Sequence, residues 1–288
     1  MPHVNENTTW FTEFNPCGVG TSYLLQNAKP LHVEQTAWQK IEIFQTEAFG
    51  KLMVFDGLIM LTERDNFLYH EMISHPALLS HPKPENIAII GGGDCGTIYE
   101  VLKHQSVKNA TQIEIDERVT RLAEQYFPEL CRANQEPRAK FIFADGIDWI
   151  AKAAPQSLDI LIIDSTDPVG PAAGLFNLAF YENCMKALKP QGILSQQSES
   201  PIVHLSIIKE MHDAMRQTGF KYFNLLSFPQ PSYPSGQWSI TLASKENTLK
   251  EFQTDKKQIE KLQTKYYNSE IHQAAKALPN FVRNTLKI

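Results

Sequence analysis

Two carboxylates in the segment Asp164–Pro171 are the strongest candidates for chemistry in this sequence. Asp164 follows the short apolar run Ile160–Ile163, and Asp167 comes three residues later in a loop stiffened by proline and glycine. Like charges held close together raise each other's pKa unless a cation lies between them. The spacing therefore predicts a site for a positively charged ligand, although Asp-Pro and Gly-Pro pairs are also common in plain turns.

A glycine-rich loop, Gly91–Gly96, follows the apolar run Ile87–Ile90. It matches the pattern G-x-G-x-x-G, in which glycines allow a tight turn and the close approach of a dinucleotide. Asp94 stands inside this loop, where a carboxylate would repel a pyrophosphate and attract a cation. We therefore expect Asp94 to share one acidic cleft with Asp164 and Asp167, and a dinucleotide-dependent oxidoreductase is the alternative.

Acidic residues also follow the next two predicted strands. Glu114 ends the second strand, where an acid typically binds the ribose hydroxyls of an adenosine. Asp116 is expected to cap the helix that begins after it. Asp145 and Gly146 follow the third strand, where the carboxylate could accept the adenine amino group or cap a helix. With Asp94, these positions predict an adenosine that carries a neutral or cationic tail.

Metal and hydrolase chemistry find little support in the sequence. His70, Glu71 and His75 come close to a zinc-binding helix, but H-E-x-x-H requires its second histidine where Ser74 stands. We therefore expect no metal. The sequence also lacks the G-x-S-x-G elbow of many serine hydrolases.

The elements that must position these residues alternate between strand and helix from about residue 87 onward. Short apolar strands are predicted at Ile87–Ile90, Gln112–Ile115, Phe141–Phe143, Ile160–Ile163 and Ile193–Ser195, with closing strands at Lys221–Ser227 and Trp238–Ser244. Helices are predicted at Asn66–Leu79, Glu117–Phe127, Ile147–Ala153, Asn177–Leu188 and Ile207–Thr218. Such alternation indicates an α/β fold with a mostly parallel sheet and helices on both faces, which binds ligands at the carboxyl ends of its strands.

The first part of the chain shows strand signals without intervening helices. Strands are predicted at Leu31–Gln35, Gln39–Thr46, Gly50–Phe55 and Leu58–Leu61. The pair Asp56-Gly57 indicates a hairpin turn, because both of its positions favour a positive φ. We therefore predict a small antiparallel β-domain over residues 1–62 and a catalytic α/β domain over residues 63–288.

Composition excludes several classes of protein. The 288 residues have a formal net charge of −5, and 42% of them are hydrophobic. These values are typical of a globular protein and argue against a nucleic-acid partner, which requires a basic face. No apolar run approaches the length of a membrane span, and the N-terminus lacks a signal peptide. The four cysteines show no paired spacing, which predicts free thiols and a cytoplasmic location.

The sequence resembles the polyamine aminopropyltransferases over nearly its whole length. The matching segments are Trp38-Gln39, Ala48-Phe49-Gly50, Thr62-Glu63-Arg64-Asp65, Tyr69-His70-Glu71-Met72, Gly91–Gly96, Ile113–Asp116, Asp145-Gly146, Asp164–Pro171, Leu175-Phe176, Tyr233-Pro234, Tyr266-Tyr267-Asn268 and Ala277-Leu278-Pro279. The resemblance implies a methyltransferase-like Rossmann fold behind the N-terminal β-domain, and a homodimer or homotetramer. It also implies transfer of the aminopropyl group of decarboxylated S-adenosylmethionine to putrescine, giving spermidine and methylthioadenosine, with no further cofactor.

The resemblance assigns roles to residues at the matching positions. Asp164 corresponds to the proton acceptor, and Tyr69 would support it by hydrogen bonding. The amine would be bound by His70, Asp164, Asp167 and Tyr233, and the aminopropyl amine by Asp94. The thioadenosine would be contacted by Gln39, Glu114, Asp145, Gly146 and Pro171.

Three positions depart from the usual family pattern. Cys95 replaces a glycine, Tyr99 replaces an arginine, and Met60 replaces a glutamine close to the amine site. Met60 leaves the acceptor open among putrescine, cadaverine, agmatine, spermidine and a carboxylated diamine. A small-molecule methyltransferase and a non-catalytic polyamine-binding protein are further alternatives, but a binding protein would not need a proton acceptor.

Overall fold

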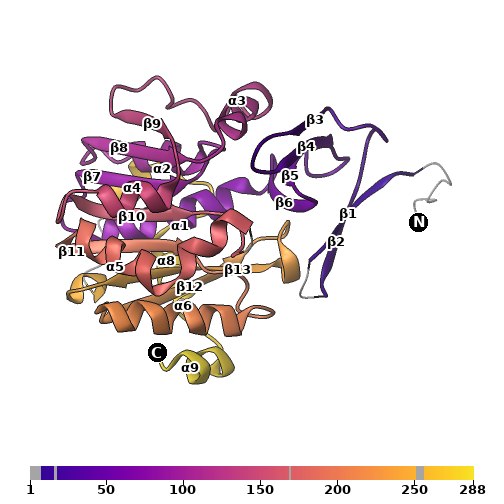
Figure 1. Cartoon of the computed structure of the whole chain (residues 1–288). Helices are drawn as coiled ribbons and strands as arrows, with labels where there is room; N and C mark the ends of the chain where they lie inside the picture. The colour runs from indigo at the N-terminus through magenta and orange to yellow at the C-terminus, as the bar shows by residue number, and fades with distance from the viewer. Residues whose placement is uncertain (1–7, 16–17, 169, 251–255) are drawn as a thin grey trace.

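The computed structural model describes residues 8–15, 18–168, 170–250 and 256–288. Within these residues, the strands form a seven-stranded sheet, a four-stranded sheet and a two-stranded hairpin. The two smaller units are built from the N-terminal strands, which lie to one side of the large sheet (Figure 1).

The N-terminal strands pair in antiparallel fashion. The hairpin consists of β1 (Trp10–Phe14) and β2 (Gly20–Leu24), and the four-stranded sheet consists of β3 (His32–Gln35), β4 (Lys40–Gln45), β5 (Lys51–Phe55) and β6 (Leu58–Thr62). The turn between β5 and β6 has φ of 48° at Asp56 and 87° at Gly57. The predicted hairpin is therefore confirmed, whereas the strand signals of β1 and β2 were not recognised in the sequence.

The large sheet has the order β12-β13-β11-β10-β7-β8-β9. Its strands are β7 (Asn86–Gly91), β8 (Asn109–Glu114), β9 (Ala139–Phe143), β10 (Leu158–Asp164), β11 (Leu188–Gln197), β12 (Tyr222–Pro229) and β13 (Gln237–Ser244). The strands from β9 across to β11 are parallel, and β13 runs antiparallel to both of its neighbours, β11 and β12. The chain runs outward from β7 through β8 to β9, then continues with β10 on the other side of β7. The carboxyl ends of β7 and β10 therefore form the switch point, where such sheets bind ligands.

Helices cover both faces of this sheet, as predicted (Figure 1). One face packs against α1 (Asn66–Ser80), α2 (Gly96–Leu102), α7 (Lys256–Lys261) and α8 (Ser269–Ala275). The other face packs against α4 (Gly146–Lys152), α5 (Leu178–Ala187), α6 (Leu205–Thr218) and α9 (Asn280–Leu286). In β7, Ile87 and Ile89 point to the first face and Ala88 and Ile90 to the second, as the two-residue period of a strand requires.

One helix joins the small sheet to the large domain. Val119 and Leu122 of α3 (Glu117–Tyr126) pack in one apolar cluster with Ile41 and Ile43 of β4. Because α3 follows β8 directly, this packing holds the four-stranded sheet beside the carboxyl ends of β7 and β8. Short 3-10 segments are η1 (Gly170–Phe176), η2 (Pro234–Gly236) and η3 (Asn247–Lys250).

Candidate active site

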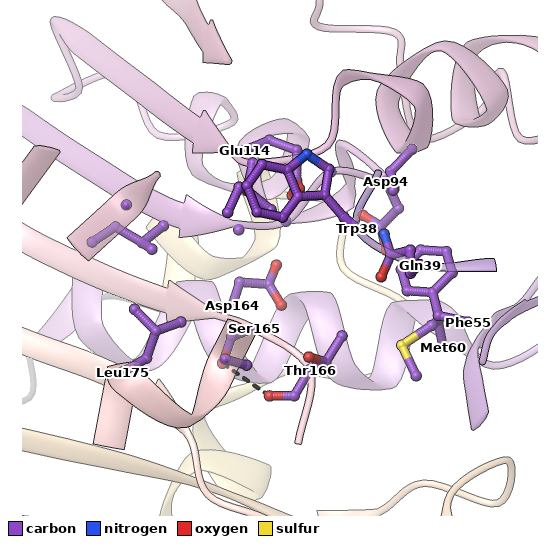
Figure 2. Close-up of a pocket in the computed structure, with 18 of the residues that line it drawn as sticks. Trp38, Gln39, Phe55, Met60, Asp94, Glu114, Asp164, Ser165, Thr166 and Leu175 are labelled. Atoms are coloured by element: carbon purple, nitrogen blue, oxygen red, sulfur yellow. Dashed lines mark hydrogen bonds between the residues drawn. The ribbon is translucent and has the colours of Figure 1, made fainter. Parts of the chain in front are cut away.

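A cavity of about 170 Å³ lies at the carboxyl ends of β7, β8 and β10. Figure 2 shows Gln39, which directly precedes β4, and Met60 of β6 on one side, with Asp164 and Leu175 of the large domain on the other. Trp38 also lines the cavity. The lining includes most residues predicted to bind the donor, namely Gln39, Asp94, Glu114, Asp145 and Gly146, and also the predicted proton acceptor Asp164. The strand ends therefore converge as the parallel topology requires.

Asp164 ends β10 directly beside the glycine loop. Its Cα pairs with that of Gly91 across the sheet, and its backbone oxygen accepts a hydrogen bond of 2.8 Å from the amide of Gly92. Tyr69 Oη donates to Asp164 Oδ1 at 2.6 Å, and Thr97 Oγ1 donates to Oδ2 at 2.6 Å. Burial and the charge of Asp94 raise the pKa of the carboxyl group.

Tyr69 keeps its proton over the physiological pH range. Burial, followed by the negative charge of Asp164, raises the pKa of this phenol well above its usual value. Tyr69 therefore acts as a hydrogen-bond donor toward Asp164. Its ring also meets that of Tyr233 edge to face, with centroids 6.0 Å apart.

Asp94 is held by two donors on either side of its carboxylate. The amide of Gly96 donates to Oδ1 at 2.7 Å, and Nε2 of His70 lies 3.1 Å from Oδ2. Burial opposes ionisation of both side chains, but their mutual attraction prevails. It lowers the pKa of Asp94 and raises that of His70 to about 9.

His70 does not line either of the two cavities among the residues described, contrary to the expectation that it contacts the amine. It follows Tyr69 on α1, and one residue along a helix turns the side chain by about 100°. Its imidazole consequently lies behind Asp94, packed so closely that a Cβ on Gly96 would come within 2.2 Å of the ring.

Glu114 and Asp116, the two acids at the end of β8, have different partners. Asp116 caps α3 by accepting from the amide of Arg118, and its other oxygen accepts from Thr36 and Gln39. Glu114 Oε1 accepts from the amide of Asp116 at 2.8 Å. Burial is the main cause that raises the pKa of Glu114 to about 7.

Asp145 caps α4, as its competing interpretation predicted. Its Oδ1 accepts from the amides of Ile147 and Asp148, and Oδ2 has no role in the cap. The neighbouring Gly146 is required by packing, since a Cβ there would lie 2.3 Å from Ile90 Cγ2. The backbone of Pro171 belongs to η1, but its side chain lies outside the described part of the structure.

Asp167 lines a second, smaller cavity of about 40 Å³ instead of the large one. Asp94 and Asp164 line the large cavity and Asp167 the adjoining one, so the three acids predicted to share one cleft line two cavities with common walls. The chain turns at Ser165 and Thr166, which line both cavities, and this turn places Asp167 in the wall of the smaller cavity. The two cavities also share Met60, Tyr69 and Tyr233.

Two further acids lie close to Asp167 and the smaller cavity. Glu13 of β1 lines it and is buried, with Oε2 accepting from the amide of Ile59 at 2.7 Å. Glu199 is buried behind Asp167, where it lies 3.2 Å from Nδ1 of His204. Burial, the charge of Glu199 and a hydrogen bond between the carboxyl groups raise the pKa of Asp167 to about 7.

The described residues contain neither a metal-ligand cluster nor a membrane-spanning helix. No group of three or more His, Cys, Asp or Glu side chains could hold a metal ion there. No helix in that part of the chain is long and apolar enough to cross a membrane.

Two family models match most of the chain. Residues 66–255 match the spermine/spermidine synthase domain, and residues 9–63 match the spermidine synthase tetramerisation domain. A polyamine aminopropyltransferase of Thioalkalivibrio sulfidiphilus is 58% identical over 97% of this chain and 98% of its own length. One of Methylococcus capsulatus is 55% identical over 96% and 97%. The chain belongs to the polyamine aminopropyltransferase family.

Solved structures of this family have the same fold. A spermidine synthase in complex with the transition-state analogue AdoDATO superposes with a TM-score of 0.91 and 36% identity, covering 98% of this chain and 96% of that one. The spermidine synthase of Thermotoga maritima gives a TM-score of 0.89 at the same identity, covering 98% and 95%. The chain is thus an aminopropyltransferase with a methyltransferase-like fold.

The positions that depart from the family pattern have defined surroundings in this aminopropyltransferase. Met60 lines both cavities, and its backbone oxygen accepts from Tyr233 Oη at 2.6 Å. Cys95 is buried at the start of α2 with φ of 70°. Tyr99 has the ammonium of Lys103 over its ring, 4.8 Å from the centroid.

Sequence reasoning missed Glu13, Glu199 and Thr97. Glu199 carried a usable signal, because it follows β11 and so stands at a strand end like Asp164. Thr97 directly follows the glycine loop, but its contact with Asp164 requires the pairing of β7 with β10. Glu13 gave no local signal, since it lies on a hairpin far from the acidic loop in the chain.

Proposed function

We propose that this enzyme transfers the aminopropyl group of decarboxylated S-adenosylmethionine to putrescine, giving spermidine and methylthioadenosine. The observation that carries the proposal is the pair Asp94 and Asp164, two partly buried acids that line one cavity beside the predicted adenosine residues. Buried carboxylates of this kind favour cationic ligands. The donor has a sulfonium and an amine, and the acceptor has two amines.

In this proposal, the donor occupies the large cavity. Gln39, Glu114, Asp145, Gly146 and Pro171 contact its thioadenosine. Asp94 binds the aminopropyl amine by charge attraction. It would repel the carboxylate of ordinary S-adenosylmethionine, which the decarboxylated donor lacks. The substitution Asp94→Ala should weaken binding of the decarboxylated donor by about ten-fold or more, as expected for a charge-assisted contact. Unchanged donor affinity would contradict this assignment.

The acceptor extends from Asp164 into the smaller cavity. Its attacking amine lies beside the hydrogen-bonded pair Asp164 and Tyr69, and its distal ammonium lies near Asp167 and Glu13, which line the smaller cavity. Tyr233 lines the passage between the two cavities. His70, which was expected to bind the amine, acts through Asp94.

The reaction is a displacement at carbon. The lone pair of the neutral amine attacks the aminopropyl carbon bonded to sulfur, and the C–S electron pair leaves with sulfur as a neutral thioether. The new C–N bond leaves an ammonium, whose proton passes to Asp164. Freeing an amine of pKa about 10.4 at pH 7 costs about 4.6 kcal/mol. The raised pKa of Asp164 lowers the free-energy cost of moving a proton from the amine to this carboxylate. The alignment of two bound reactants can offset several kcal/mol more of the barrier.

The decisive experiment measures products and rates with decarboxylated S-adenosylmethionine and a panel of amines. Mass spectrometry should detect spermidine and methylthioadenosine with putrescine, and lower kcat/KM with cadaverine, agmatine and spermidine. The substitution Asp164→Asn should lower kcat by about 10²–10⁴, the range for loss of a general base. Asp148→Asn, on the exposed side of α4, serves as the control. Full activity of Asp164→Asn with an unchanged pH profile would refute the role of Asp164.

We also propose that residues 1–62 form a separate β-domain that assembles the enzyme as a homodimer or homotetramer. Exposed apolar side chains gather on its strands, including Trp10 and Phe14 on β1 and Val33 on β3. Phe14 is 82% exposed, an arrangement that favours association with a second copy. Light scattering should give a multiple of the chain mass, and Phe14→Ser should reduce it.

A further inference from the structure

The carboxylate of Asp164 receives hydrogen bonds from two different helices. Tyr69 on α1 donates to Oδ1, and Thr97 near the start of α2 donates to Oδ2. Both donor–acceptor distances are 2.6 Å, which is short for a hydroxyl and typical of a charge-assisted bond. Thr97 is completely buried, so water does not compete with its hydroxyl for the hydrogen bond to Asp164 in the free enzyme.

The two oxygens of Asp164 have different surroundings. Oδ2 lies against the glycine loop, where a Cβ added to Gly92 would come within 2.9 Å of it. Oδ2 is thus enclosed between this loop and Thr97. Oδ1 is bound by Tyr69, whose side chain lines both cavities. The geometry therefore leaves Oδ1 as the oxygen that faces an amine placed between the cavities.

We propose that Thr97 is a positioning residue for the reaction: its hydroxyl holds Oδ2 under the glycine loop, so that Oδ1 is presented to the attacking amine. The inference rests on the proposed function, in which Asp164 accepts the amine proton. Without this hydroxyl, the carboxyl group could rotate and place its proton-accepting oxygen away from the amine.

The hydroxyl also sets the proton affinity of Asp164. Several titratable groups face this carboxylate: Tyr69 and His70 on α1, Asp94 after β7, Glu114 at the end of β8, and Tyr233 before η2. Burial and Asp94 raise the pKa of Asp164, whereas His70, Thr97 and Tyr69 lower it. Loss of the Thr97 hydroxyl alone should therefore raise that pKa and leave the other contributions in place.

The test compares Thr97→Val, Thr97→Ala and Thr97→Ser. The pH profile of kcat is measured with both substrates saturating, so that it reports the enzyme–substrate complex. Because the deprotonated carboxylate is needed, a higher pKa moves the acidic limb to higher pH. We expect the acidic limb of the Val and Ala variants to move by about one pH unit. Their kcat above this limb should fall about ten-fold, because the carboxylate is no longer held in place. The Ser variant should restore the wild-type midpoint.

A matched control removes another buried hydroxyl from the same region. Thr120 donates to the backbone oxygen of Gly93 at 2.9 Å, so Thr120→Val should leave the midpoint in place. A wild-type midpoint in folded Thr97→Val or Thr97→Ala would overturn the proposal, as would an equal shift in Thr97→Ser. These outcomes are independent of Asp164→Asn, whose full activity would instead refute the proposed function.

Discussion

His70 and Asp94 form a buried ion pair that joins α1 to the glycine loop, with 3.1 Å between Nε2 and Oδ2. The amide of Gly96 holds the other oxygen of Asp94. Burial would lower the pKa of His70, but the charge of Asp94 and their hydrogen bond, assisted by Asp164 and Glu100, raise it to about 9. The free enzyme therefore carries an imidazolium behind the carboxylate proposed to bind the donor amine.

This ion pair should make the stability of the free enzyme depend on pH. A histidine with a raised folded-state pKa contributes its full stabilisation below the unfolded-state pKa of about 6.5. The contribution is lost as the pH rises through about 9 and amounts to at most about 3 kcal/mol. The substitution His70→Gln keeps a hydrogen-bonding group but cannot carry the charge. Urea denaturation should therefore show that the unfolding free energy falls less between pH 6.5 and pH 9.5 in this variant than in the wild type.

His212 provides a matched control for that measurement. Burial lowers its pKa to about 3, so it stays neutral over the whole interval. The substitution His212→Gln should reduce stability at both pH values equally. A wild-type pH dependence in His70→Gln would contradict the assignment of an imidazolium at this position.

Binding of the nucleoside product should become tighter as the pH rises through about 7. Burial raises the pKa of Glu114 to about 7, and in the proposed binding mode the ribose hydroxyls require the deprotonated carboxylate as acceptor. Between pH 6 and 8, the deprotonated fraction rises about ten-fold, and the affinity for methylthioadenosine should rise by a similar factor. Calorimetry should also show weaker, pH-independent binding for Glu114→Gln. The same substitution at the exposed Glu117 should keep the wild-type dependence, and a flat wild-type profile would argue against Glu114 as the ribose ligand.

Much of the fold, and the acids that line the large cavity, could be predicted because the relevant signals are local. Each parallel strand is a short apolar run, and Asp94, Glu114 and Asp164 stand at or just after the ends of such runs. Parallel strands bring their carboxyl ends to one edge, so strand order alone places these acids together. The predicted cap at Asp116 follows equally from local backbone geometry.

The remaining features depend on contacts between distant segments. Glu13 reaches the smaller cavity only because the β1–β2 hairpin lies beside β6, and no pattern around Glu13 encodes that placement. Asp167 leaves the large cavity through a turn whose course the sequence does not specify. The C-terminal helices α7, α8 and α9 were also missed, because they are short and gain stability from packing on the large domain.

Diamine binding should release protons near neutral pH. Burial and Glu199 raise the pKa of Asp167 to about 7, so the carboxyl group is about half protonated at pH 7. An ammonium favours the ionised form, and putrescine added to the complex with methylthioadenosine should release about half a proton per site. Calorimetry in buffers of different ionisation enthalpy measures this number. Asp167→Asn should bind the diamine more weakly and release fewer protons, whereas net proton uptake by the wild type would exclude Asp167 as the ligand.

Gly91 should be far less tolerant of a side chain than Gly57, although their backbones are alike. The φ angles are 84° and 87°, so alanine strains both positions by about 1 kcal/mol. A Cβ on Gly91 would also lie 2.1 Å from the backbone oxygen of Asp164, whereas no atom lies within 4 Å of one on Gly57. The clash involves two adjacent strands and can be relieved only if β7 and β10 move apart.

The costs of Gly91→Ala and Gly57→Ala therefore separate steric contact from backbone strain. Chemical denaturation should show a loss of about 1 kcal/mol for Gly57→Ala and of about 3 kcal/mol or more for Gly91→Ala, the added part being typical of overpacking. Because the displaced atom belongs to Asp164, folded Gly91→Ala should also have a lower kcat. Gly57→Ala, at a turn outside both cavities, should keep the wild-type kcat. Equal losses of stability would mean that the two strand ends are not in contact as described.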